Sequence, residues 1–249
     1  MKKIKITRNL YQYRFPPFEG EQFGFNIHVL INGYEALLID TAFECHAKLV
    51  VEDLKETNIE IKHVVFSHFH PDHISGLPAL NRPKLYGNGR YQETLNKYTP
   101  IEKHQHFEGI NSLDNNSVIN FGSFELRFKL IKGHVPCGMF TIIDDKFIHV
   151  ADDIMESNNG EPLLPSVHID NAQDHINSLE LLKKFASCTL LLSHGNAISC
   201  KSKVLQGIEQ RQNYLKAIVS SIEPITIERA LVNCHYDFLQ KSWHKYVYS

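Results

Sequence analysis

The sequence of 249 residues lacks a long uninterrupted apolar run. A membrane-spanning helix needs about 20 consecutive apolar residues, and the basic stretch at residues 1–8 is not followed by the apolar segment of a secretory signal. The sequence is also poor in cysteine, with five residues and no close CxxC pair: Cys45, Cys137, Cys188, Cys200 and Cys234. An odd, scattered set argues against a disulfide framework and indicates a reducing compartment. We therefore predict a soluble, cytoplasmic protein.

The sequence has no excess of charge of either sign. It contains 26 Lys and Arg against 28 Asp and Glu, for a net charge of -2, which gives no electrostatic case for a nucleic acid or an anionic membrane as partner. We expect a small-molecule substrate instead. The length permits one large α/β domain or two small ones, and we predict one domain over residues 1–249 because the candidate ligands run from 68 to 194.

What the chain does contain is a dense group of metal-binding residue types. His68, His70, Asp72 and His73 fall within six positions, directly after the apolar run at residues 64–66 and Ser67. Three imidazoles and a carboxylate suit zinc. With His and Asp each near 5% of residues, this pattern arises by chance at roughly one position in 10⁵. Pro71 disfavours helix at His70 and should keep the turn extended, so that the ligands surround a point.

The residues before this block predict strands and one helix. A first strand is expected near residues 3–8, a loop at 15–23, and an alternating strand at 25–31 that ends at Asn32-Gly33, a type I′ hairpin signal. The return strand at 35–39 is apolar throughout, so it should be buried on both faces and deliver Asp40 at its end. A helix at 46–57 then leads to a strand at 63–67. The block should thus lie at the C-terminal end of a buried strand, where open α/β sheets place their sites.

The later residues predict a second region rich in strands. Short elements are expected at 74–80 (helix), 84–86 (strand) and 89–97 (helix), followed by a polar, irregular stretch to Asn116 in which His104 and His106 lie on the loop surface. Strands are predicted at 124–130, 139–143, 147–150 and 189–192, with helices at 171–186 and 203–220. The aromatic tail at 243–248 fits either packing against the core or a subunit contact, which leaves a homodimer open.

The block at residues 68–73 resembles the His-x-His-x-Asp-His signature of the metallo-β-lactamase superfamily of hydrolases. The other motif residues of that superfamily occur in the same order, so the resemblance covers nearly the whole chain. They are Asp40 after a strand, His134 in Gly133-His134, Asp152 in Ala151-Asp152-Asp153, and His194 in Ser193-His194-Gly195. The resemblance implies an α/β (α+β) fold, a four-layer αββα sandwich.

The resemblance also implies a site for two divalent transition-metal ions. Zinc is the first expectation, with manganese or iron as alternatives. His68, His70 and His134 would bind the first ion, and Asp72, His73 and His194 the second. Asp152 would bridge the two, and Asp40 would orient a ligand. A hydroxide bridging the metals would be the nucleophile, and Asp72 would relay a proton, so Asp72 and Asp152 are the catalytic candidates. Asp152 is preferred over Asp153 on the hypothesis that residues 150–153 continue a strand, in which neighbours point to opposite faces.

The family does not fix the substrate. We expect hydrolysis of an ester, thioester or lactone. A phosphodiesterase on the same site, or a metal-bearing ligand-binding protein with little turnover, are the alternatives. Lactonases of similar length have a tyrosine three positions after the bridging aspartate, where this chain has Met155, which weighs against a lactonase. The carbonyl preference depends on an expected apolar rim around the site, formed by Phe15, Phe18, Phe23, Phe69, Met155, Leu163 and Leu164.

Overall fold

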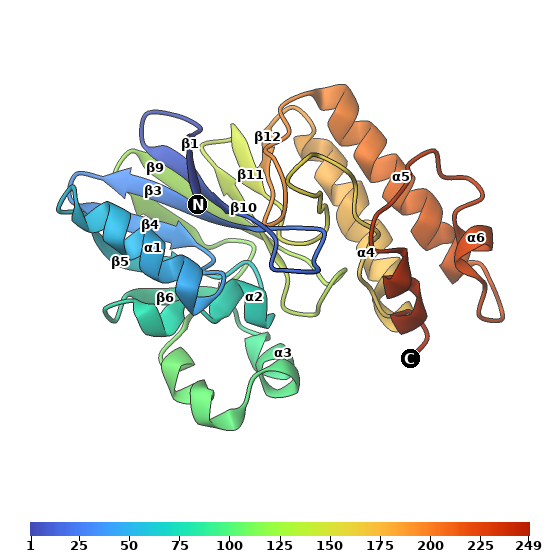
Figure 1. Ribbon diagram of the computed structural model, residues 1–249, viewed down its shortest axis with the longest axis horizontal. Coiled ribbons are helices and arrows are strands. Elements are labelled where there is room, and N and C mark those ends of the chain that lie inside the picture. Colours follow the sequence, from blue (N-terminus) through green and yellow to red (C-terminus); the bar gives the residue numbers. More distant parts are fainter.

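The computed structural model describes all 249 residues and contains two mixed sheets packed face to face (Figure 1). The larger sheet has seven strands in sequence order; β1 to β4 pair antiparallel and β4 to β7 pair parallel. Its strands are β1 (Lys2–Lys5), β2 (Leu10–Phe15), β3 (Phe25–Asn32), β4 (Glu35–Ile39), β5 (Glu60–Val65), β6 (Lys84–Asn88) and β7 (Asn111–Leu113).

The smaller sheet has five strands in the order β12-β11-β10-β9-β8. Only β11 and β12 pair parallel in it. The strands are β8 (Val118–Phe121), β9 (Phe124–Leu130), β10 (Met139–Ile143), β11 (Phe147–His149) and β12 (Thr189–Leu191).

Helices cover the outer face of each sheet. Figure 1 shows α1 (Glu44–Lys55), α2 (Pro71–Ile74) and α3 (Tyr91–Tyr98) beside the larger sheet, and α4 (Ile169–Leu182), α5 (Lys201–Val219) and α6 (Ile227–Ala230) beside the smaller one. Four 3₁₀ segments occur at Leu77–Ala79, Ile101–Phe107, Lys183–Phe185 and Lys241–Tyr246. The order helix, sheet, sheet, helix is the αββα sandwich that the resemblance implied.

Strand β4 shows how the layers are held together. Its four apolar residues are fully buried, and they alternate: Ala36 and Leu38 pack under α1, whereas Leu37 and Ile39 pack between the two sheets. Burying each such leucine or isoleucine contributes roughly 1.5–3 kcal/mol. The prediction of a strand buried on both faces is therefore confirmed. Because β4 is fixed on both faces, the position of Asp40 at its end is fixed as well.

Several predicted boundaries are wrong in instructive ways. Strand β2 was missed because its sequence does not alternate: Gln12 is buried, and its amide donates to the carbonyl of Gly195 at 2.9 Å. The predicted helix at 74–80 is instead α2 followed by a 3₁₀ turn, and the irregular stretch to Asn116 contains a 3₁₀ segment and β7. His70 is extended as expected (ψ 152°), but Pro71 begins a helix directly after it, as proline at the first helical position often does.

The hairpin turn between β3 and β4 is displaced by one residue from its predicted position. Asn32 pairs with Glu35, so the two central residues are Gly33 and Tyr34. Only Gly33 has a positive φ, +58°. A positive φ at the first central residue alone fits a type II′ turn, which requires glycine there.

The C-terminal tail packs back against the chain, one of the two alternatives left open by the sequence. The Trp243 ring lies 5.6 Å from the Phe23 ring at an edge-on angle. His244 is buried, accepts a hydrogen bond from the Tyr214 hydroxyl at 2.9 Å and donates to the Ile225 carbonyl at 2.7 Å.

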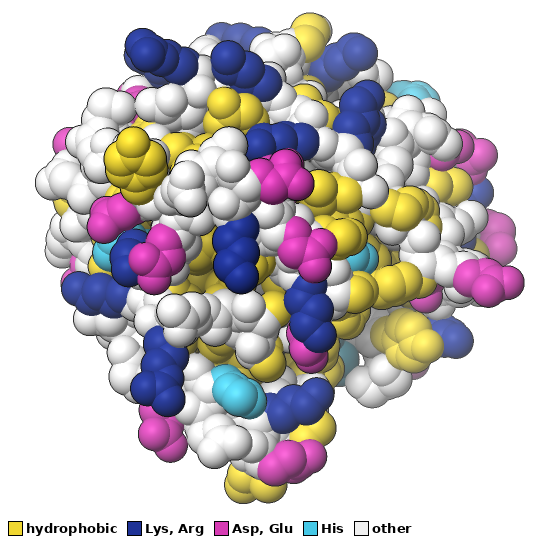
Figure 2. All heavy atoms as spheres, turned by 60° about the vertical axis from the view of Figure 1, so that its left-hand side comes forward, with side chains coloured by type: hydrophobic (Ala, Val, Ile, Leu, Met, Phe, Trp, Pro, Cys, Tyr) yellow, Lys and Arg dark blue, Asp and Glu magenta, His cyan; other side chains and the backbone are white.

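The face of the molecule shown in Figure 2 is mixed in charge. On the face shown in Figure 2, Lys and Arg side chains are interspersed with Asp and Glu, with scattered apolar side chains between them. None of the helices combines the length and the apolar character needed to cross a bilayer.

Candidate metal centre

The seven predicted ligand residues lie together at one edge of the sandwich, in loops that follow strand ends and, for Asp72 and His73, in the short helix α2. His68 follows β5 in sequence, His134 follows β9, Asp152 follows β11 and His194 follows β12. Their nitrogen and oxygen atoms form two groups, each with its atoms within 4.8 Å of one another. The first group is His68, His70 and His134; the second is Asp72, His73, Asp152 and His194.

The first group consists of three imidazoles. Nδ1 of His70 lies 3.2 Å from Nε2 of His68 and 2.9 Å from Nε2 of His134. Burial lowers the pKa of all three rings, that of His70 to about 3. Neutral rings have a nitrogen lone pair to offer, so this group presents three ligands to a cation.

The second group combines two imidazoles with two carboxylates. Nε2 of His194 lies 3.4 Å from Asp72 and 3.5 Å from Asp152, and Nε2 of His73 lies 3.4 Å from Asp152. A tetrahedral ion with bonds near 2.05 Å would hold its ligand atoms about 3.4 Å apart. The observed separations therefore leave the space that such an ion would fill.

Asp152 faces both groups, one oxygen to each. Its Oδ1 is the atom near His73 and His194, whereas its Oδ2 lies 3.6 Å from Nε2 of His134 and 3.9 Å from Nε2 of His68. This is the geometry that a bridging carboxylate requires.

Asp153 points away from the cluster and accepts a hydrogen bond from the Ser178 hydroxyl. The reason that we gave for preferring Asp152 is nevertheless wrong. Strand β11 ends at His149, and residues 150–153 form a turn with Ala151 at φ +47°. The turn, and not strand alternation, separates the two aspartates.

Hydrogen bonds on the far side of the rings fix which nitrogen faces the cluster. Nδ1 of His134 donates to the Ser166 carbonyl at 2.7 Å, and Nδ1 of His194 donates to the Gly24 carbonyl at 2.8 Å. A carbonyl can only accept, so the proton of each ring resides on Nδ1 when the ring is neutral. The lone pair of Nε2 is then directed at the cluster, as in metal-binding histidines.

Asp40 orients two further rings, as the sequence predicted for this residue. Its Oδ2 accepts a hydrogen bond from Nδ1 of His73 at 2.8 Å and another from the Ser67 hydroxyl at 2.7 Å, and its Oδ1 accepts from the Ser67 amide at 2.7 Å. The Ser67 hydroxyl donates its single proton to Asp40. Its oxygen can therefore only accept a hydrogen bond from Nδ1 of His68, which lies 3.2 Å away. One buried carboxylate thus sets a ring in each group.

The second group calls for positive charge. Against the effect of burial, which lowers it, Asp152 and Asp72 raise the pKa of His194 to about 10 and that of His73 well above its usual range. Against burial, which raises them, His73 and His194 lower the pKa values of both carboxyls. Oδ1 of Asp152 and Nε2 of His73 are buried without a hydrogen-bond partner. Divalent cations would satisfy these atoms and replace the protons, so the residues present fit a dinuclear metal site.

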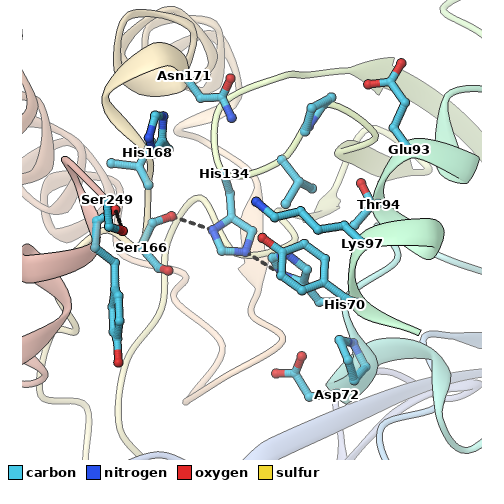
Figure 3. A pocket seen from close by; sticks show the side chains of 16 residues that line it. His70, Asp72, Glu93, Thr94, Lys97, His134, Ser166, His168, Asn171 and Ser249 are labelled. Atoms are coloured by element: carbon cyan, nitrogen blue, oxygen red, sulfur yellow. Dashed lines mark hydrogen bonds between the residues drawn. The ribbon is translucent and has the colours of Figure 1, made fainter. Parts of the chain in front are cut away.

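The cluster lies beside a cavity of about 660 Å³. Figure 3 shows His70, Asp72 and His134 on its wall, with Lys97, Thr94 and Glu93 from α3 on one side and Ser166, His168 and Asn171 on the other. Tyr98, Tyr246 and Ser249 contribute further wall. Glu93, Thr94, Lys97 and Tyr98 come from the last two turns of α3, and Tyr246 and Ser249 from the packed tail.

The predicted apolar rim is wrong. None of its seven residues lines this cavity. Phe15, Phe69, Met155, Leu163 and Leu164 are core residues with exposures of 3% or less. Phe23 does touch the cluster, since its ring lies 4.9 Å from that of His194, and Phe18 packs on Phe25, Phe43 and His46. Phe15 and Phe69 therefore belong to the hydrophobic core and Phe23 supports a ligand ring, whereas Tyr98 and Tyr246 are the aromatic residues that line the cavity.

Comparison with known proteins identifies the family. A model of the metallo-beta-lactamase superfamily matches residues 23–195, a span that contains every residue of the cluster. The chain belongs to the metallo-β-lactamase superfamily.

Solved structures share the metallo-β-lactamase fold. A beta-lactamase domain protein from Burkholderia ambifaria superposes with a TM-score of 0.69 at 14% identity, covering 97% of this chain and 84% of that one. A metallo-beta-lactamase family protein from Thermus thermophilus gives a TM-score of 0.65 at 16% identity, covering 96% and 93%. At these identities the likeness concerns the fold alone.

The curated proteins to which this chain is similar include thioesterases. The atrochrysone carboxyl ACP thioesterase of Aspergillus fumigatus is 36% identical over 103 residues, 39% of this chain and 24% of that protein. A longer alignment to a protein of the same name and organism covers 216 residues at 23% identity, 84% of this chain and 63% of that protein. The chain therefore matches less than two thirds of the length of these relatives.

Sequence reasoning missed the walls of the metallo-β-lactamase cavity. Lys97, Tyr98 and Asn171 occur on ordinary amphipathic helices, and nothing in their sequence context distinguishes them from other exposed residues. The His104 and His106 pair lies outside both groups, as predicted; His104 Nε2 donates to the Thr99 carbonyl at 2.9 Å and His106 is exposed.

Proposed function

We propose that this protein is a metal-dependent thioesterase acting on a small acyl thioester, with two divalent ions as cofactors and zinc as their first candidate. Esters and lactones, which share the carbonyl centre, are the related substrates. The observation that carries the proposal is the placement of two ligand groups, joined by Asp152, beside an open cavity. The thioesterase relatives favour the thioester within this class.

The bound ions would supply a water of pKa near 7 as nucleophile and polarise the substrate carbonyl. The chain's own residues would hold the ions and transfer a proton to the leaving group. Asp72 lines the cavity with its side chain 23% exposed, whereas Asp152 is 6% exposed. Of the two carboxylates, Asp72 is therefore the one that reaches a substrate, and its oxygen can take up a proton and return it to the leaving thiolate.

The phosphodiesterase alternative has less support. A phosphodiester is recognised best by arginines that bind its oxygens in pairs, and the cavity wall contains one lysine and no arginine. The third alternative, a metal-bearing binding protein, differs from an enzyme in turnover alone, so the same assay decides it.

A substrate panel at fixed metal loading tests the proposal. Zinc-loaded protein would be assayed with acyl thioesters, aryl esters, lactones and a bis-aryl phosphodiester. We expect kcat/KM to be highest for a thioester and to rise as pH passes about 7, where the water ionises. His134→Ala should abolish turnover, and His106→Ala, which removes an exposed histidine outside the cluster, should not. A phosphodiester with the higher kcat/KM would overturn the proposal, and so would tight binding of acyl compounds without turnover.

A further inference from the structure

The cavity beside the metal centre contains one unusual feature, an uncompensated cation. Lys97, in the last turn of α3, is the only lysine or arginine among the residues that line it. Glu93, one turn earlier, is paired with Arg90, whose Nη2 lies 3.4 Å from its Oε1. The Lys97 ammonium has no carboxylate within ion-pair distance and lies instead over the Tyr98 ring, 5.0 Å from its centroid.

The direction of this side chain is informative. In Figure 3 Lys97 extends from α3 across the cavity, with its ammonium directed toward His134. Glu93, on the same helix, points away from the ligands. Lys97 is also exposed to solvent, so its charge is accessible from the cavity. Placed here, it offers a positive charge to whatever enters.

The distances limit where an anion on the substrate must be. The Lys97 ammonium and the His70 ring both lie against the Tyr98 ring, 5.0 and 4.7 Å from its centroid, so the ammonium is within about 10 Å of the centre of the His70 ring. A carbonyl at the first ligand group and an anion at Lys97 would then be separated by no more than about this distance. A carboxylate a few bonds from the scissile carbonyl, on the acyl side, meets this condition. The phosphate of a phosphopantetheine arm does not, because two amide groups lie between it and the thioester sulfur.

We infer that Lys97 is a specificity residue that binds a carboxylate on the acyl group of the substrate, so that the preferred substrates are monothioesters of short dicarboxylic acids. The hydrolysis of a thioester in this inference rests on the proposed function, whereas the recognition of a carboxylate by Lys97 rests on the cavity alone. Asn171 enters the cavity from the first turn of α4 on the opposite wall and supplies a neutral amide to the same space (Figure 3).

The test compares thioesters that differ only in charge. The N-acetylcysteamine thioesters of glutarate and pentanoate would be hydrolysed by the zinc-loaded protein, along with the pentanoyl thioester of phosphopantetheine. For Lys97→Met we expect KM for the glutaryl thioester to rise about tenfold, the loss typical of a hydrogen bond to a charged group, with values for pentanoyl substrates unchanged. Lys97→Arg should restore most of the affinity. Lys103→Met is the matched control, because it removes the same charge from an exposed residue outside the cavity.

Three outcomes would overturn the inference: equal losses for glutaryl and pentanoyl thioesters, no loss for either, or a loss confined to the phosphopantetheine thioester. A binding measurement separates this result from the fate of the proposed function. The thioether analogues, which cannot be hydrolysed, would be titrated calorimetrically into the zinc-loaded wild type and Lys97→Met. If no thioester is turned over but the glutaryl thioether binds about tenfold more tightly to the wild type than to Lys97→Met, the thioesterase proposal fails and the role of Lys97 holds. If the two proteins bind it equally, the role of Lys97 fails.

Discussion

Replacing Asp40 by asparagine should weaken the second metal site through a single proton. Asp40 is 1% exposed and accepts hydrogen bonds from the Ser67 amide, the Ser67 hydroxyl and Nδ1 of His73. An asparagine has the same shape but offers one oxygen and one NH₂. If its NH₂ faced the Ser67 amide, two donors would oppose each other, and the backbone N–H has no alternative. The NH₂ must therefore take the place of Oδ2, beside the Ser67 hydroxyl and His73.

The consequence falls on His73. The serine can rotate its hydroxyl and accept, but Nδ1 of His73 can accept only if its proton moves to Nε2, the atom that faces Asp152 and Asp72. A protonated Nε2 cannot bind a metal ion. Substitutions of residues that orient a metal-binding histidine cost about 10–100-fold in affinity, or roughly 1.4–2.8 kcal/mol. We expect a loss in this range for one of two ions, with a smaller effect on the other.

Competition with a chromophoric chelator would measure both affinities. Asp53→Asn is the matched control, because Asp53 also accepts hydrogen bonds from two side chains, Lys3 and Tyr13, but contacts no residue of the cluster. Denaturant unfolding of the metal-free proteins would show whether Asp40→Asn merely destabilises the fold. Wild-type affinity at both sites in Asp40→Asn would refute the tautomer argument, and so would an equal loss in Asp53→Asn.

Three further predictions concern the same region. Metal analysis of protein purified without chelator should find two transition-metal ions per chain, and a ratio that stays at or below one after zinc, manganese or iron supplementation would contradict the dinuclear site. Asp152→Ala should lose metal and activity, whereas Asp153→Ala should keep most of both, because Asp153 faces Ser178; equal losses would reverse that assignment. His28 is fully buried with neither nitrogen hydrogen-bonded, and burial lowers its pKa well below 6.5. As pH falls below 6.5, only the unfolded state binds a proton at His28. The free energy of unfolding of the metal-free wild type should therefore fall by about 1.4 kcal/mol more than that of His28→Leu between pH 8 and 5.5. Denaturant unfolding would measure both values, and the same pH dependence of unfolding free energy in the two proteins would show that His28 does not contribute.

The resemblance of the ligand motif to the metallo-β-lactamase superfamily predicted the layered fold and the cluster residues, and local patterns predicted the strands that place those residues. Strand β4 is a continuous apolar run and β9 alternates, so both could be found from the sequence. His134 and His194 follow strands of the smaller sheet, and the packing of that sheet on the larger one brings them toward the block at residues 68–73. Strand β2 escaped because the reason for its burial is not local. Gln12 is tolerated in the core only by its bond to Gly195, 183 residues away in sequence.

The cavity wall could not be predicted for a related reason. Apolar residues near the ligands were expected to face a substrate, but Phe69 is needed in the core against Phe66, Tyr91 and Phe107. A large apolar side chain that follows a ligand in sequence is thus buried in the core and does not line the cavity. The remaining space is lined by residues from α3, the start of α4 and the tail, whose positions depend on how the outer helices pack.

The two ligand groups also connect the two halves of the sandwich. Each group takes residues from loops of both sheets: His68 and His70 with His134 in the first, and Asp72 and His73 with Asp152 and His194 in the second. The loop of His194 is already fixed to the larger sheet, because the Asn26 side-chain amide donates to the carbonyls of Leu192 and Gly195 at 2.7 and 2.8 Å. These bonds place the ligands before any ion binds, so little ordering free energy is left for the ion to supply. Binding energy not needed for ordering adds directly to the stability of the packed sheets, and the ions that activate water would also hold the two sheets together.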